Sequence, residues 1–134
     1  MQKTFSVRTR SRTGFVDITG EVRRAVEELG VADGAVLVYV PHTTAAVTIN
    51  ESADPDVARD VGVTLSEMVP ATGDYRHSEG NSDAHVKSSL VGCSETVLVC
   101  GGELVLGTWQ GIFFCEFDGP RTRNVLVGTL GSLG

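Results

Sequence analysis

Two short strand-like segments separated by a pair of glycines give the strongest constraint on how this chain folds. Residues 96–100 and 103–106 flank Gly101-Gly102, and a glycine pair between such segments is typical of a two-residue hairpin turn. Two more segments with strand composition follow the hairpin, at 111–117 and 124–129. The C-terminal third of the chain is therefore predicted to consist of consecutive antiparallel strands.

The rest of the chain alternates between strand and helix patterns. Strands are predicted at 2–10, 15–18, 35–40 and 45–50. A helix with Thr19 as its cap ends at Gly30, and a second helix begins at Asp54-Pro55, a capping residue followed by a first-turn proline. A third short helix is predicted at 84–90, with Asp83 as its cap.

These elements predict the fold class α+β, with antiparallel, β-rich, sandwich-like sheets and two or three short helices. The chain has 134 residues, which is the size of one domain, and it has no linker, repeat or low-complexity tract. We expect a single domain over residues 1–134. Residues 70–83 form a long polar segment, and loops of this length in compact domains are usually functional or disordered.

Charge and cysteine content exclude several classes of protein. The net charge is −6 and no run of Lys and Arg is present, so we expect no nucleic-acid partner. No segment has the apolar length of a signal peptide or membrane span, so we expect a cytoplasmic protein without a membrane partner. Cys93, Cys100 and Cys115 lack CxxC spacing, and their apolar neighbours predict buried thiols rather than disulfides or a zinc ribbon.

The chain has three histidines, His42, His77 and His85, and all lie in segments without regular patterning. Imidazole is the commonest zinc ligand, and three such ligands leave one coordination position open for water or substrate. We expect the three rings to converge on a divalent metal ion, zinc or magnesium, or on a pyrophosphate. The spacing between His77 and His85 is not a known zinc motif, so three unrelated histidines are the alternative.

Carboxylates fall in the same segments, and Glu51 and Asp83 are the candidates for catalytic roles. Such groups bind magnesium ions that hold a pyrophosphate, or they orient a ligating histidine from behind. The alternative is that these loops are acidic because they face water. For Asp83, capping the following helix is an equally good interpretation.

A lone tryptophan between glycines marks the start of the strand at 111–117. Trp109 is a candidate for stacking on a planar ring, and Gln110 for binding the polar edge of that ring. The alternative is that Trp109 anchors the core. Further along, Glu116 needs a partner if it is buried, and Arg121 is the natural partner, either for Glu116 or for a substrate phosphate.

Three segments together resemble the YjbQ-like family: PHTTAA at 41–46, EGNSDAH at 79–85, and GTWQGI at 107–112 followed by EFDGPR at 116–121. The resemblance extends from Thr4 to Leu130. It implies a β-rich α+β fold, a compact homotrimer and the activity of a secondary thiamine-phosphate synthase. It also favours placing the three histidines in one site. Thr43 and Asn81, which lie in the same segments, are further candidates for substrate binding.

Three functional hypotheses follow. The first is a transferase that joins a pyrimidine bearing a pyrophosphate leaving group to a thiazole phosphate. There, the histidines would hold a metal ion or the pyrophosphate, and Arg121 would balance phosphate charge. The second is a hydrolase with a three-histidine metal centre. The third is a non-catalytic trimer that binds a small molecule or metal. We expect the chain to associate with other copies of itself in a homotrimer. We also expect it to bind a small molecule, which in the transferase hypothesis is phosphorylated.

Overall fold

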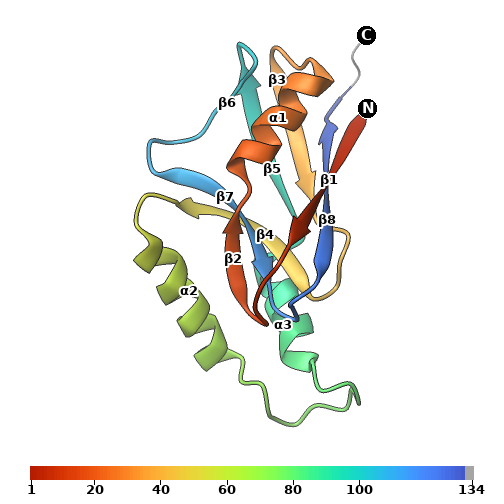
Figure 1. Ribbon diagram of the computed structural model, residues 1–134, viewed down its shortest axis with the longest axis vertical. Coiled ribbons are helices and arrows are strands. Elements are labelled where there is room, and N and C mark those ends of the chain that lie inside the picture. Colours follow the sequence, from red (N-terminus) through yellow and green to blue (C-terminus); the bar gives the residue numbers. More distant parts are fainter. Residues whose placement is uncertain (132–134) are drawn as a thin grey trace.

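The structure, a computed structural model, describes residues 1–131. Its strands are β1 (Gln2–Arg8), β2 (Gly14–Asp17), β3 (Gly34–Tyr39), β4 (Ala45–Glu51), β5 (Ser94–Cys100), β6 (Glu103–Leu104), β7 (Gln110–Glu116) and β8 (Thr122–Thr129). Its helices are α1 (Thr19–Leu29), α2 (Pro55–Met68) and α3 (Ser82–Val91). The predicted α+β class, with antiparallel sheets and three short helices, is confirmed (Figure 1). None of these helices is both long and apolar enough to cross a membrane.

The strands form two sheets in which every pairing is antiparallel. The larger sheet has the order β1-β8-β3-β5-β6, and the smaller has the order β2-β7-β4. The glycine hairpin is confirmed, because Cys100 pairs with Glu103 across the turn. Gly101 and Gly102 have φ angles of 59° and 79°, the left-handed conformation that a tight hairpin requires and that glycine adopts without strain.

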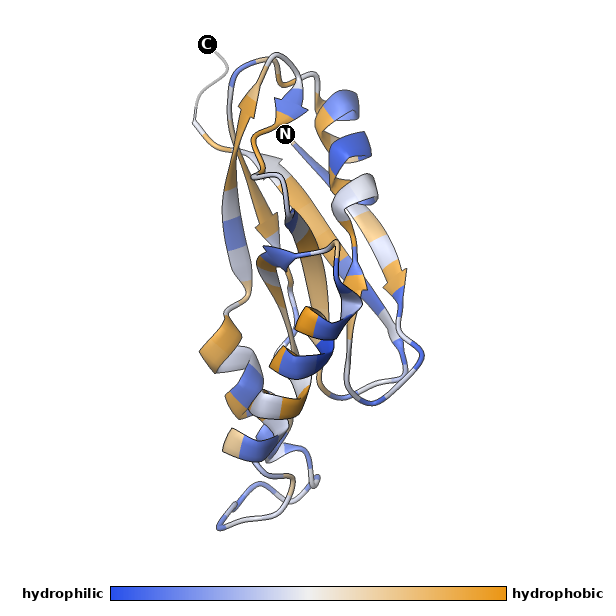
Figure 2. Cartoon of the chain, turned by 90° about the vertical axis from the view of Figure 1, so that its left-hand side faces the viewer, coloured by the Kyte–Doolittle hydropathy of each residue, from blue (hydrophilic) through white to orange (hydrophobic). Residues whose placement is uncertain are grey.

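Strand periodicity determines which side chains enter the core. In β5, Val97 and Val99 are buried while Leu98 between them is exposed. The buried face of the larger sheet packs against α1 and one face of the smaller sheet, and the opposite face of the smaller sheet packs against α3. The smaller sheet is therefore the middle layer. Figure 2 shows apolar residues concentrated along the strands, with polar residues in the loop between α2 and α3.

At the start of each of the first two helices, an aspartate carboxylate accepts a hydrogen bond from a backbone N–H. Thr19 was expected to cap α1, but Ile18 occupies that position and Asp17 accepts hydrogen bonds from the Thr19 N–H and hydroxyl over 2.9 and 2.6 Å. The cap therefore lies one residue earlier than expected. Thr19 belongs to the first turn of α1, because the Asp17 carboxylate, a stronger acceptor than a hydroxyl, binds both of its donors. The predicted cap of α2 is confirmed, since Asp54 accepts from the Asp56 N–H over 2.9 Å.

Two of the three cysteines differ from the prediction. Cys93 and Cys100 are exposed, because they lie in the turn before β5 and on the outer face of its last residue. Cys115 is buried as expected, and burial raises the pKa of its thiol to about 12. Cys115 is therefore unreactive at neutral pH, whereas the other two thiols are accessible.

Candidate functional site

The residues expected to form one site fall into two groups at opposite ends of β4. Ala45, the first residue of β4, lines a cleft together with His42 and His85. Glu51 is the last residue of the same strand. A seven-residue strand spans roughly 20 Å, so a single copy of the chain does not bring Glu51 to the histidines.

The first group surrounds a hollow of about 380 Å³, which we call the histidine cleft. The loop between β3 and β4 contributes His42 and Thr43, and α3 contributes His85. The full lining is His42, Thr43, Ala45, His85, Ser88, Ser89, Gly92 and Cys93. Two of the three segments that resemble the YjbQ-like family therefore meet at this cleft.

His42 is held in one orientation by the backbone of β8. Its Nε2 accepts a hydrogen bond from the Asn124 N–H over 2.9 Å, which is possible only when Nε2 carries no proton. Burial lowers the pKa of His42, and the positive charge of Arg123 lowers it further. At neutral pH the ring is therefore uncharged, with its proton on Nδ1.

The other two histidines contact each other near the start of α3. The rings of His77 and His85 lie 5.3 Å apart between centroids and meet edge to face at 85°. The Nε2 of His77 also lies 3.8 Å from a carboxylate oxygen of Glu79. His85 thus contacts His77 on one side and borders the cleft with His42 on the other, while His77 itself does not line the cleft.

A metal ion bound by all three histidines does not fit this arrangement within one copy. Among residues 1–131, no three His, Cys, Asp or Glu side chains are grouped as ligands of one ion. Ligation by Nε2 of His42 would displace its hydrogen bond to Asn124, and ligation by Nδ1 would require the ring proton to move to the nitrogen that accepts that bond. The geometry gathers the histidines in one region without offering three-histidine coordination.

Asp83 anchors α3 rather than capping it, so the predicted cap is corrected. It lies inside the helix, after Asn81 at the cap position, and its side chain is buried. Both carboxylate oxygens accept hydrogen bonds from Arg12 over 3.1 Å, and Lys87 lies 3.6 Å away. Burial alone would raise the pKa of Asp83, but the hydrogen bonds and charge of Arg12, together with the charge of Lys87 and the Ala84 backbone, outweigh it and the pKa is lowered.

Asn81 and Arg121 are brought together by a shared partner, Asp118. The Asp118 carboxylate accepts from the Asn81 side-chain amide over 2.8 Å and from the Arg121 guanidinium over 3.1 Å. Arg121 also donates through Nε to the Asp118 carbonyl, and half of its side chain is exposed. Its positive charge contributes to the lowered pKa of His42. Asp118 therefore orients the guanidinium, and the charge of Arg121 acts on His42 in the cleft.

The buried partner of Glu116 is Arg123, so the predicted pairing with Arg121 is wrong. Arg123 donates hydrogen bonds to both Glu116 carboxylate oxygens. Its Nη2 also donates to the hydroxyl and the carbonyl oxygen of Thr44. A sequence signal for this partner existed, because Arg123 has the same strand parity as Val125 and Val127, which point into the core. Arg121 precedes β8 and lies outside that pattern.

Sequence reasoning also missed Arg12 and Lys87, the partners of Asp83. Lys87 was detectable, because it lies four residues after Asp83 on the same helix. Arg12 had no such signal. It lies 71 residues from Asp83 in the sequence, and only the packing of the β1–β2 loop against α3 brings the two side chains together.

The second group lies where β4 ends and β7 begins. Glu51 pairs with Gln110, and the Ser52 N–H donates to the Trp109 carbonyl over 2.8 Å. Gln110 accepts from the Gly107 N–H over 2.8 Å, which closes the loop before β7. Trp109 is 63% exposed. The alternative in which Trp109 anchors the core of the chain is therefore excluded.

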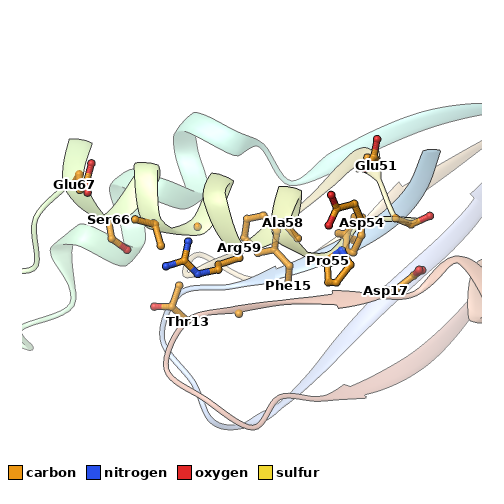
Figure 3. A pocket seen from close by; sticks show the side chains of 15 residues that line it. Thr13, Phe15, Asp17, Glu51, Asp54, Pro55, Ala58, Arg59, Ser66 and Glu67 are labelled. Atoms are coloured by element: carbon orange, nitrogen blue, oxygen red, sulfur yellow. The ribbon is translucent and has the colours of Figure 1, made fainter. Parts of the chain in front are cut away.

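A larger hollow than the histidine cleft lies next to this second group, between α2 and β2. It has a volume of about 740 Å³, and Figure 3 shows α2 side chains such as Ala58 and Arg59 on one side, with Phe15 and Thr13 on the other. Acidic side chains border its end near the start of α2. Of the residues expected for the site, only Glu51 reaches this groove.

The structure defines an α+β protein with two antiparallel sheets and a cleft lined by His42 and His85, and comparison with known sequences defines the family. The family model described as "UPF0047 protein YjbQ-like" matches residues 3–132. The chain belongs to this family, which confirms the resemblance seen in its three segments.

Relatives in bacteria and archaea match over nearly their whole length. The UPF0047 protein YugU of Bacillus subtilis is 52% identical over 132 residues, which covers 98% of this chain and 100% of the relative. The UPF0047 protein MJ1081 of Methanocaldococcus jannaschii is 52% identical over 127 residues, covering 95% and 92%. These printed names state a family and no activity.

Solved structures show the same fold. An uncharacterised conserved protein of the YjbQ/UPF0047 family from Clostridium acetobutylicum is 53% identical, with a TM-score of 0.93 over 96% of this chain and 99% of that protein. A YbjQ-like protein of unknown function from Sulfolobus solfataricus is 33% identical, with a TM-score of 0.93 over 98% and 97% of the two chains.

Proposed function

We propose that this chain is a transferase of the thiamine-phosphate synthase type and that it binds phosphorylated small molecules at the histidine cleft. The observation that carries the proposal is the meeting of His42 and His85 in one cleft whose electrostatic field includes Arg121. Phosphate esters are acceptor-rich anions, so a cleft with imidazoles and nearby guanidinium charge suits them.

The proposed reaction needs positioning more than a strong nucleophile. The thiazole nitrogen attacks the methylene carbon of the pyrimidine, a C–N bond forms, and the C–O bond to pyrophosphate breaks with its electron pair going to the leaving group. The ring nitrogen becomes a thiazolium cation and no proton has to be removed. The enzyme therefore has to align two rings and stabilise the departing anion.

The roles of individual residues follow their positions. Arg121, held by Asp118, supplies positive charge for the pyrophosphate, while His42, Thr43 and His85 line its binding place. Asp83 anchors α3 by accepting hydrogen bonds from Arg12. A zinc or magnesium ion would add Lewis-acid charge, but residues 1–131 of one copy provide no group of three His, Cys, Asp or Glu ligands. No step of the proposed reaction therefore passes through a metal ion.

The proposal includes a homotrimer, which exposed apolar side chains support. Trp109 and Leu98 are 63% and 62% exposed, and none of residues 55–68 of α2 is fully buried. Large apolar side chains on the surface favour association with other copies. In such a trimer, Trp109 and Gln110 of one copy would be available to a cleft that they do not reach within their own chain.

The test is a coupled product assay. The purified chain is incubated with hydroxymethylpyrimidine pyrophosphate and hydroxyethylthiazole phosphate, and thiamine phosphate and pyrophosphate are quantified. The expected result is equal amounts of both products, with a rate at least about tenfold lower in His85→Gln. Glu103→Gln, on the distant hairpin, is the control. Phosphate or pyrophosphate release without thiamine phosphate would instead indicate the hydrolase, and no turnover would indicate the non-catalytic binding protein.

A further inference from the structure

The histidine cleft contains a hydrogen-bond donor that the protein itself does not use. Because Nε2 of His42 accepts from the Asn124 N–H, the neutral ring carries its proton on Nδ1. The Nδ1–H and the Nε2 lone pair point in different directions from the ring, so the Nδ1–H is not directed at the Asn124 N–H, and His42 lines the cleft. This Nδ1–H makes no hydrogen bond to any residue in the described range 1–131.

A second unused donor belongs to a residue of α3 that also lines the cleft. Ser88 of α3 is 7% exposed and lines the cleft, and within residues 1–131 its hydroxyl oxygen has no hydrogen-bond partner. Leaving a buried hydroxyl unpaired is unfavourable. Neighbouring Ser89 is different, because its hydroxyl already donates to the His85 carbonyl over 3.0 Å.

The charges around the cleft favour an anion over a cation. Arg123 and Arg121 act on His42 as positive charges, and Glu116 acts on it as an opposing negative charge. The carboxylates nearest to them, Glu116 and Asp118, are already engaged in ion pairs with these two arginines. The cleft therefore combines neutral N–H and O–H donors with guanidinium charge, and it lacks a free carboxylate in its lining.

We infer that the histidine cleft binds a phosphate oxyanion directly, with the Nδ1–H of His42 and the hydroxyl of Ser88 as its donors and without a metal ion on His42. The identity of the anion as phosphate rests on the proposed function, whereas the two donors rest on the geometry alone. Binding through Ser88 requires a rotation about its χ1, because its hydroxyl oxygen is buried in the unliganded protein.

The protonation of His42 is testable by NMR of protein labelled with ¹⁵N-histidine. At neutral pH, the expected spectrum shows a protonated Nδ1 and an unprotonated Nε2 for His42. Inorganic pyrophosphate shifts the Nδ1–H signal, whereas one equivalent of zinc leaves both His42 signals in place. A protonated Nε2, or zinc coordination at His42, overturns the inference.

Cys93 provides a reporter inside the cleft, and Cys100 provides a matched control outside it, since both thiols are exposed. Alkylation by N-ethylmaleimide is followed at each cysteine by mass spectrometry. Saturating pyrophosphate is expected to slow alkylation of Cys93 at least fivefold and to leave Cys100 unchanged. Equal rates with and without pyrophosphate, or the same protection by acetate, contradict a phosphate site.

Two variants separate the donors from the fold. Ser88→Ala is expected to weaken pyrophosphate binding by about tenfold, the value of one hydrogen bond to a charged acceptor, with an unchanged melting temperature. His42→Gln keeps an acceptor for the Asn124 N–H but removes the Nδ1 donor, and it should weaken binding similarly. Ser94→Ala, beside Cys93 but outside the cleft lining, is the control. Wild-type affinity in both Ser88→Ala and His42→Gln would overturn the assignment.

These outcomes are separable from those of the transferase assay. Pyrophosphate binding through His42 and Ser88 without product formation leaves the inference standing and removes the transferase. Product formation with zinc bound to His42 supports the transferase and overturns the inference.

Discussion

Arg123 and Glu116 form a buried ion pair that ties the two sheets together. Arg123 Nε donates to Glu116 Oε1 over 2.9 Å, and the two side chains are only 3% and 1% exposed. Glu116 ends β7 of the smaller sheet and Arg123 belongs to β8 of the larger one. Because Arg123 also donates to Thr44, the same pair positions the loop that carries His42.

Replacing Glu116 by Gln should destabilise the protein strongly, because it leaves the buried Arg123 guanidinium without a counter-charge. The expected loss in the free energy of unfolding is about 3–5 kcal/mol. Arg121→Gln is the matched control, since its ion pair is exposed and should contribute no more than about 1 kcal/mol. Urea unfolding of both variants makes the comparison. Losses of similar size would show that Glu116 and Arg123 do not act as a buried pair.

The same carboxylate makes the fold sensitive to acid. Burial by itself raises the pKa of Glu116, but the hydrogen bonds from Arg123 and Thr9 outweigh it, so its pKa in the folded state is lowered. A lowered pKa means that the stabilisation is complete above the unfolded-state value of about 4.3 and is lost as pH falls through the folded-state value. Melting temperatures measured from pH 7 to 3 should fall steeply once the pH drops below the unfolded-state pKa of about 4.3. Glu116→Gln should show a shallower decline, and an equally steep one would assign the acid sensitivity to other groups.

Trp109 should contribute little to the stability of the chain. It is 63% exposed, so Trp109→Ala is expected to cost less than about 1 kcal/mol, compared with about 3–5 kcal/mol for a buried aromatic residue such as Phe114. Chemical unfolding of Trp109→Ala and Phe114→Ala tests this. If the two losses are equal, Trp109 is buried in the assembled protein by a neighbouring copy.

Gly111 should tolerate no side chain. A Cβ atom there would lie 2.6 Å from Cβ and 2.9 Å from Oγ of Ser52, which are distances that force a shift of the chain. Gly111→Ala is expected to cost about 1–3 kcal/mol. Gly20→Ala provides the contrast, because no atom lies within 4 Å of the added Cβ and alanine in a helix is favoured by up to about 1 kcal/mol. Thermal melts should therefore move in opposite directions, and a shift in the same direction would contradict the steric account.

The homotrimer predicts a definite mass in solution. At micromolar concentration, light scattering should give three times the 14.2 kDa of the chain. Leu98→Lys places a charge on the exposed face of β5 and should weaken the trimer if that face is an interface. Glu103→Lys, on the adjacent hairpin strand, is its control. A monomer mass for the wild-type chain would remove the quaternary part of the proposed function.

The sequence by itself determined the local structure of this protein. Strand alternation places Val97 and Val99 in the core, Gly101-Gly102 makes the hairpin, and Asp54-Pro55 starts α2, because each depends on interactions between neighbouring residues. The motif segments also determined the family. These features require no knowledge of which distant residues meet.

Tertiary structure decided which side chains pair and which candidates share a site. Asp83 has the local sequence of a helix cap, yet the approach of Arg12, 71 residues away, turns it into a buried anchor. Glu51 and His42 are close in sequence, but an extended strand separates them by roughly 20 Å. Nor does any local pattern reveal that the Asn124 N–H fixes the proton of His42, 82 residues away. Contacts between distant segments depend on how the two sheets and α3 pack, and that packing is a property of the whole chain.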